Sequence, residues 1–131
     1  MSINHQMIRT PRQWKAATGL SEKQFYDLSK LLGATYEDFH EDSLIDIAAR
    51  REDKPTFSTY EGLLFFILYS LKSGLTYDLL ALNFNISRSV AFEQQAAGVQ
   101  LLQMTLQANG HLPRRRFDSF EDLEKALDGY D

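Results

Sequence analysis

The apolar positions between residues 62 and 108 follow a helical spacing and predict three consecutive helices. Residues 62–73 are apolar on nearly every side, which is typical of a helix at the centre of a domain. Glycine at position 74 predicts the end of this helix. A shorter apolar pattern covers residues 76–84, and a longer one without proline covers residues 88–108. These patterns predict an all-α fold, a compact domain of several helices.

Residues 76–106 have the pattern of a helix-turn-helix. Thr76 is a favourable N-cap for the first helix. The side chains of this helix that we expect to point inward are Leu79, Leu80, Leu82 and Phe84. Asn85 tolerates the left-handed backbone of a sharp turn, and Ser87 can cap the second helix. This geometry could present the second helix to the major groove of duplex DNA, but it also occurs in αα-corners that never contact DNA.

Three further helices are predicted upstream, over residues 10–18, 21–32 and 36–51. Thr10 is expected to cap the first of them, with Pro11 at its first helical position. Residues 21–24 (SEKQ) match a capping box, as do residues 58–61 (STYE) before the central helix. Gly33 is expected to end the second helix, so that residues 36–51 form a separate one.

These elements predict one domain over residues 10–110 with a segment of different character at each end. Residues 1–9 contain Arg9 and no acidic residue, and we expect them to form a flexible basic arm. Residues 111–131 are expected to begin as an extended, Arg-rich segment and to end in a short acidic helix. The chain of 131 residues is 44% hydrophobic, which suits a single globular core.

Composition disfavours several functional classes. The chain has no cysteine and its three histidines are far apart, so no disulfide, metal site or cofactor is expected. No nucleophile–base pair or phosphate loop indicates an enzyme. The N-terminus lacks the apolar stretch of a secretory signal, and residues 63–69 fall short of the roughly 20 residues that span a bilayer. We expect a cytoplasmic protein without membrane contact, associated with the nucleoid if it binds DNA.

Charge is distributed unevenly along the chain, whose formal net charge is −4. Basic residues without acidic neighbours occur in residues 1–18 and again in residues 114–116, whereas residues 117–131 are strongly acidic. A polyanion would therefore meet the N-terminal arm and the helix-turn-helix. The residues expected to contact it are Ser87, Arg88, Ser89, Phe92 and Gln95 on the second helix, Arg114, Arg115 and Arg116 after it, and Arg9, Arg12 and Lys15 near the N-terminus.

Two stretches of the sequence are distinctive. The first is SGLTY at residues 73–77, which leads into Leu80-Ala81 and Ile86-Ser87, and the second is LPRRRFDS at residues 112–119. Together they resemble the N-terminal region of bacterial insertion-sequence transposases of the DDE type, and the resemblance extends from about residue 18 to residue 127. In that family the first stretch belongs to a helix-turn-helix thought to bind the terminal inverted repeats. The second leads into an RNase H-like catalytic domain with an Asp-Asp-Glu triad.

The resemblance implies a DNA-binding portion of a transposase without its catalytic domain, and hence no enzyme. Its expected partner is double-stranded DNA at transposon ends. The chain would be the first of two reading frames, a truncated element or a domesticated regulator. The resemblance leaves these three contexts open.

The predicted second helix begins with few basic residues, which motivates an alternative. Arg88 is its one base, and phosphate would repel Glu93 unless that carboxylate accepts from a cytosine amino group. Phe92 could touch a thymine methyl group or be buried against a protein partner. The alternative is a protein-interaction or self-association module, which would form a homodimer or pair with a separately encoded catalytic transposase subunit and regulate transposition.

Overall fold

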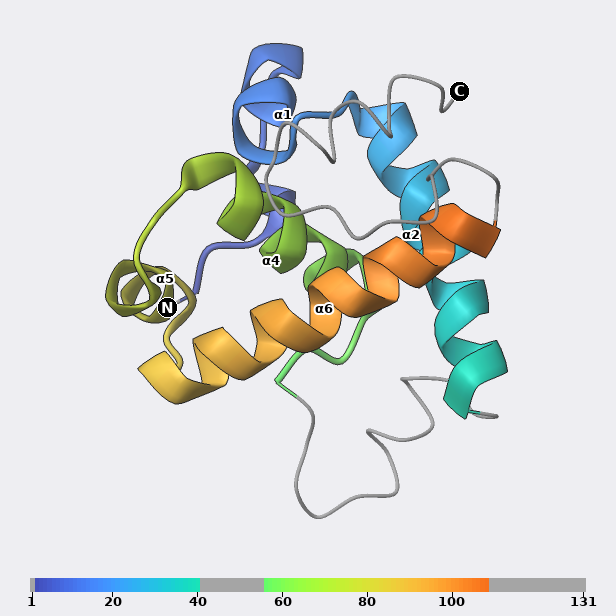
Figure 1. Ribbon diagram of the computed structural model, residues 1–131. Helices are drawn as coiled ribbons and strands as arrows, with labels where there is room; N and C mark the ends of the chain where they lie inside the picture. Colours follow the sequence, from blue (N-terminus) through green and yellow to red (C-terminus); the bar gives the residue numbers. More distant parts are fainter. Residues whose placement is uncertain (1, 41–55, 109–131) are drawn as a thin grey trace.

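The computed structural model describes residues 2–40 and 56–108, and the regular structure within them is entirely helical (Figure 1). A short 3-10 helix, η1 (His5–Met7), precedes the α-helices of this part of the chain. They are α1 (Pro11–Thr18), α2 (Glu22–His40), α4 (Tyr60–Ser73), α5 (Tyr77–Phe84) and α6 (Arg88–Ala108). The all-α prediction is confirmed. The predicted bounds of α5 and α6 are also those of the structure.

Reciprocal hydrogen bonds fix the starts of α1 and α2. The Thr10 hydroxyl accepts from the Gln13 backbone N–H at 3.1 Å, and the Gln13 side chain accepts from the Thr10 N–H at 3.3 Å. Ser21 and Gln24 form the same arrangement at 3.2 and 3.0 Å. Both predicted caps are confirmed. In each of them the two hydrogen-bonded residues are three positions apart, so the pattern could be recognised from the local sequence.

The prediction that α2 ends at Gly33 is wrong, since α2 continues to His40. Gly33 is buried inside the helix against the ring of Tyr60, and a Cβ at position 33 would lie 2.7 Å from Tyr60 Cδ2. The glycine therefore permits the close approach of α2 and α4 and does not terminate a helix. The separate helix predicted over residues 36–51 is, as far as His40, the last turn of α2, and its remainder lies outside the described residues.

The start of α4 also differs from the prediction. Thr59 is its N-cap, and the Thr59 hydroxyl accepts from the Gly62 N–H at 3.1 Å. The third helical residue is then Gly62, which has no side chain to complete the capping box predicted from Ser58. The end of α4 is confirmed, since Gly74 adopts the left-handed conformation with φ of 64°.

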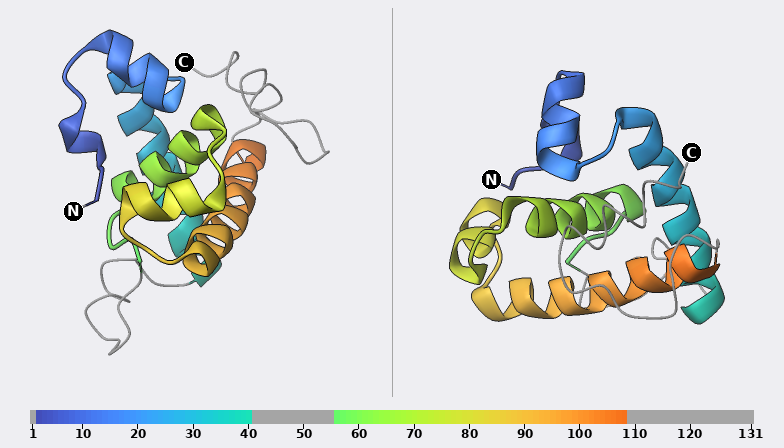
Figure 2. Two further views of the ribbon diagram at one scale, coloured as in Figure 1. Left: turned by 90° about the vertical axis from the view of Figure 1, so that its left-hand side faces the viewer. Right: turned by 45° about the horizontal axis from the view of Figure 1, so that its top comes forward.

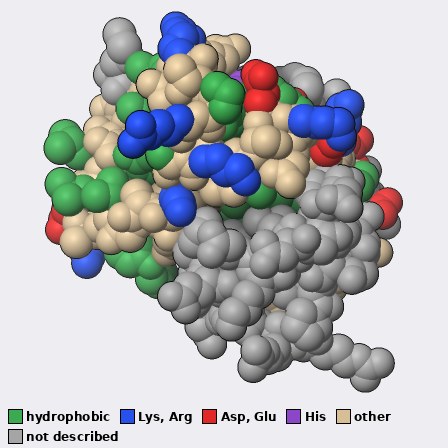
Figure 3. All heavy atoms as spheres, turned by 90° about the horizontal axis from the view of Figure 1, so that it is seen from above, with side chains coloured by type: hydrophobic (Ala, Val, Ile, Leu, Met, Phe, Trp, Pro, Cys, Tyr) green, Lys and Arg blue, Asp and Glu red, His purple; other side chains and the backbone are tan. Residues whose placement is uncertain are grey.

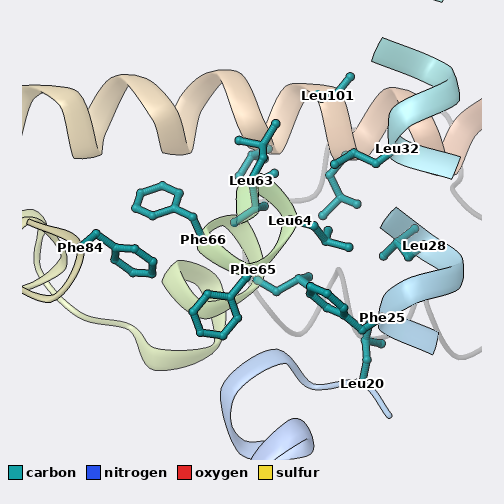
Figure 4. Close-up of a cluster of buried hydrophobic side chains, with 14 of the residues drawn as sticks. Leu20, Phe25, Leu28, Leu32, Leu63, Leu64, Phe65, Phe66, Phe84 and Leu101 are labelled. Carbon is teal, nitrogen blue, oxygen red and sulfur yellow. The ribbon is translucent and has the colours of Figure 1, made fainter. Parts of the chain in front are cut away.

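Helix α4 occupies the centre of the molecule. In both views of Figure 2 it lies between α1 on one side and α6 on the other, and it packs against both and against α2. Six consecutive side chains of α4 are buried: Leu63, Leu64, Phe65, Phe66, Ile67 and Leu68. Figure 4 shows part of this core, where side chains of α4 meet those of α2, α5 and α6. Burial on all sides explains why this stretch shows no polar face in the sequence.

Residues 2–9, expected as a flexible arm, have specific contacts with the body of the protein. The Ile3 backbone N–H donates to the Asn83 carbonyl in the last turn of α5 at 3.0 Å. Ile3 and Ile8 pack against the core. The His5 ring stacks on Phe25 of α2 with 5.7 Å between ring centroids. This segment therefore links the end of α5 to α2.

Candidate nucleic-acid interface

The turn between α5 and α6 is built as the sequence indicated. Asn85 has φ of 55° and ψ of 48°, the left-handed conformation that asparagine tolerates better than most residues. The Ile86 backbone N–H donates to the Ala81 carbonyl at 3.0 Å, and half-buried Ile86 packs against the core. The Ser87 hydroxyl accepts from the Val90 N–H at 3.2 Å, which caps α6. Both ends of the turn are thus anchored.

Helix α5 turns only one of its faces to the core. Leu80, Ala81 and Phe84 are buried, whereas the side chains of Leu79 and Leu82 are 46% and 74% exposed. The prediction that Leu79 and Leu82 point inward is therefore wrong. Positions 80, 81 and 84 share one helical face, and positions 79 and 82 fall outside it. Two leucines lie on the surface as a result.

The first two turns of α6 lie on the outside of the protein. Arg88, Ser89 and Phe92 are exposed, and Phe92 retains 54% of its accessible surface. Ala91 is the one fully buried residue of this stretch and fixes which side of the helix faces inward. Figure 2 shows this end of α6 beside α5, at the opposite end from the contact with α2.

Arg88 has an acidic neighbour on the other helix. Its Nε atom lies 3.5 Å from Oδ1 of Asp78, and the two side chains are 68% and 78% exposed. An ion pair this open to water typically contributes less than about 1 kcal/mol to the free energy of unfolding. The pair instead connects the first turn of α5 to the first turn of α6.

Tyr77 organises the second turn of α6. Its hydroxyl donates to Oε1 of Gln95 at 2.6 Å, and its ring meets Phe92 edge to face with 5.3 Å between centroids. The hydrogen bond engages the carbonyl oxygen of the half-buried Gln95 side chain and fixes its position beside Tyr77. A surface hollow of about 450 Å³ is lined by Tyr77, Arg88, Ser89, Phe92 and Glu93.

The candidate residue set omitted Glu93, which the structure places on the exposed surface of α6. Ser89, Glu93 and Ala96 follow the spacing i, i+4, i+7 and are all exposed. Small or apolar residues such as Ala91 and Gly98 are buried on the other side of α6. Their spacing in the sequence is the signal that could identify the exposed face. An acidic side chain therefore stands among the exposed residues of the interface.

The basic residues near the N-terminus are not brought together with Arg88. Arg9, Arg12 and Lys15 are exposed on or beside α1, and α4 lies between α1 and α6 in Figures 1 and 2. Figure 3, a view onto the α1 side, shows lysine and arginine side chains spread over that face. Arg114, Arg115 and Arg116 lie outside the described residues. Among the candidate residues that the structure describes, those brought together are Ser87, Arg88, Ser89, Phe92 and Gln95.

No family model, curated protein or solved structure matches this chain. Within residues 2–40 and 56–108, no helix combines the length and apolar character needed to cross a membrane. The same residues contain no group of three or more histidine, aspartate or glutamate side chains arranged to hold a metal ion.

Proposed function

We propose that this protein binds duplex DNA through α5, the turn at Asn85 and the first two turns of α6. The observation that carries the proposal is the exposure of Arg88, Ser89 and Phe92 on a helix whose start is capped and whose later turns are buried. The resemblance of residues 73–77 and 112–119 to insertion-sequence transposases supplies the class of target. We infer that the target is the terminal inverted repeat of such an element.

In this proposal α5 crosses the sugar–phosphate backbone while the start of α6 enters the major groove. The groove is about 12 Å wide and accommodates one α-helix. Arg88 would donate to a base edge or phosphate, and Ser89 would donate to phosphate. Phe92 would contact a thymine methyl group, and Gln95 would offer its amide nitrogen.

The charges near α6 predict a moderate dependence of affinity on salt. Arg9, Arg12 and Lys15 lie beyond α4, so we do not expect them to contact the same stretch of duplex. With Arg88 and the three arginines at residues 114–116 as the remaining basic contacts, the log–log slope of affinity against salt should be about −4. A slope near zero would indicate that phosphate contacts do not contribute.

The proposal is tested by fluorescence anisotropy with a labelled terminal-repeat duplex and a shuffled duplex of the same composition. We expect Arg88→Ala to weaken binding to the terminal repeat about tenfold, the effect of losing one good base contact. Lys30→Ala removes an exposed basic side chain from α2 and serves as the matched control. Equal binding by wild type and Arg88→Ala would remove Arg88 from the interface. Failure of the wild type to bind either duplex would refute the function.

One observation favours self-association as a second candidate function. Leu79 and Leu82 are exposed on α5, and Figure 3 shows hydrophobic side chains at the edge of the molecule where α5 lies. In this alternative a second copy of the chain covers these leucines. Light scattering should then report a dimer for the wild type and a monomer for Leu82→Gln. A monomeric wild type at high concentration would contradict it.

A further inference from the structure

Asp78 and Arg88 are charged residues of opposite sign from the first turns of α5 and α6. Oδ1 of Asp78 lies 3.5 Å from Nε of Arg88. In a DNA-binding surface an aspartate at this place is unfavourable for affinity, since it repels phosphate. A carboxylate in the first turn of α5 is favourable for the helix dipole, and this one also lies close enough to Arg88 to influence how that side chain is oriented.

The chemistry of the guanidinium group suggests that role. Arginine carries N–H donors on Nε and on two terminal nitrogens, all in one rigid plane. A carboxylate at Nε leaves the two terminal nitrogens available to a second partner. Two parallel N–H donors match the O6 and N7 acceptors on the major-groove edge of guanine.

Holding the side chain in place also reduces the cost of binding. A long side chain that is immobilised only on binding loses conformational entropy, and this loss weakens binding. Without a partner at Nε, Arg88 could turn instead toward a phosphate, a contact that does not depend on sequence. The attraction between the Asp78 carboxylate and Nε, 3.5 Å apart, favours the orientation in which Nε faces α5.

We propose that Asp78 is a positioning residue that holds Arg88 for two-pronged recognition of a guanine. This inference rests on the proposed DNA-binding function and adds to it the base that is recognised and the residue that sets the recognition. A positioning role affects overall affinity and base preference in opposite directions, which an ordinary surface ion pair would not do. Loss of the carboxylate raises affinity for any duplex but lowers the preference for the correct base.

The test begins with selection of a preferred sequence from a pool of randomised duplexes by the wild-type protein. Arg88→Ala identifies the position that Arg88 recognises. Binding is then measured for the selected duplex and for versions with adenine or 7-deazaguanine at that position. Asp78→Asn should lose up to about fivefold in discrimination between guanine and adenine, the limit that the strength of an exposed ion pair sets. Its affinity for a shuffled duplex should rise.

Asp27→Asn is the matched control, because it removes the same charge from another surface ion pair, Lys23–Asp27 at 2.9 Å on α2. This variant should keep the full preference for guanine. Thermal unfolding followed by circular dichroism checks that Asp78→Asn remains folded. Asp78→Glu retains the carboxylate and should retain part of the discrimination.

Three results would contradict the positioning role of Asp78, and a fourth would contradict DNA binding itself. Unchanged discrimination in Asp78→Asn overturns the positioning role, as does a base other than guanine at the Arg88-dependent position. An unchanged selected sequence for Arg88→Ala also overturns it while leaving DNA binding intact. Selection of no sequence by the wild type is different, because it refutes the proposed function itself.

Discussion

The two halves of α6 differ in what surrounds them. From Gly98 onward one face of the helix is embedded in the core, with Leu102, Thr105 and Leu106 fully buried. Before Gly98 only Ala91 is buried, and Arg88, Ser89 and Phe92 face solvent. One uninterrupted helix therefore has an anchored half and a projecting half. The anchored half fixes the direction in which the projecting half points.

The two halves meet at Gly98, where α6 approaches α4 closely. A Cβ at Gly98 would lie 2.5 Å from Cγ1 of Ile67. This approach is possible only because residue 98 lacks a side chain. Beyond this contact Leu102 and Leu106 are fully buried, whereas of the residues of α6 before it only Ala91 is buried.

Truncation in the two halves should have very different costs. Leu102→Ala removes a fully buried side chain and should lower the free energy of unfolding by about 2–5 kcal/mol. Phe92→Ala removes a half-exposed ring whose described ring contact is with Tyr77, and should cost about 1 kcal/mol. Urea denaturation of both variants measures the difference. Equal costs would contradict the division of α6 into two halves.

An added methyl group at Gly98, where the two halves of α6 meet, should lower stability by an amount between those of Leu102→Ala and Phe92→Ala. Gly98→Ala gains helix propensity but forces Ile67 to move, and overpacking of this kind costs about 1–3 kcal/mol. We expect a net loss of stability in urea denaturation. Ile67→Ala combined with Gly98→Ala should cost less than the sum of the two single changes, because the smaller side chain makes room. Simple additivity would show that the close approach is not the cause.

The smallest effect on stability is expected from His5, in the N-terminal segment that contacts both α2 and the end of α5. Burial lowers the pKa of His5 below its ordinary value of 6.5, although the charge of Glu61 acts in the opposite direction. The unfolded chain therefore binds a proton more readily than the folded one. The contribution of His5 to stability is present above about pH 6.5 and falls as the pH drops below it toward the lowered pKa.

We expect the urea midpoint of the wild type to decrease slightly between about pH 7.5 and about pH 5.5 beyond the general acid effect. His5→Gln should remove that extra decrease, because glutamine does not titrate. The comparison of the two proteins at the same two pH values isolates the histidine. An identical pH dependence would mean that protonation of His5 does not affect the packing of residues 2–9.

The features that the sequence predicted are those decided by neighbours along the chain. The caps at Thr10, Thr76 and Ser87 and the left-handed Asn85 each depend on a few adjacent residues. The bounds of α5 and α6 follow from these signals. Local hydrogen bonding is therefore sufficient to locate the candidate interface in the chain.

The features that escaped prediction depend on residues distant in sequence. The sequence predicts a helix stop at Gly33, because the contact of Gly33 with Tyr60 of another helix leaves no local signal. Two other features also depend on distant residues. Tyr77 hydrogen-bonds to Gln95 of another helix, and α4 separates Lys15 from Arg88. Helical spacing gave the faces of α5 but not which of them meets the core, so Leu82 was placed wrongly.

The ring of Tyr60 against Gly33 has a consequence for the variation that this chain can accept. Alanine is normally the preferred residue within a helix, so a library with every amino acid at position 33 would ordinarily favour it. Here an added methyl group would lie 2.7 Å from Cδ2 of Tyr60, so the tyrosine ring would have to move before alanine fits. Selection of such a library for folded protein should favour glycine over alanine at that place, an inversion of the usual helical ranking.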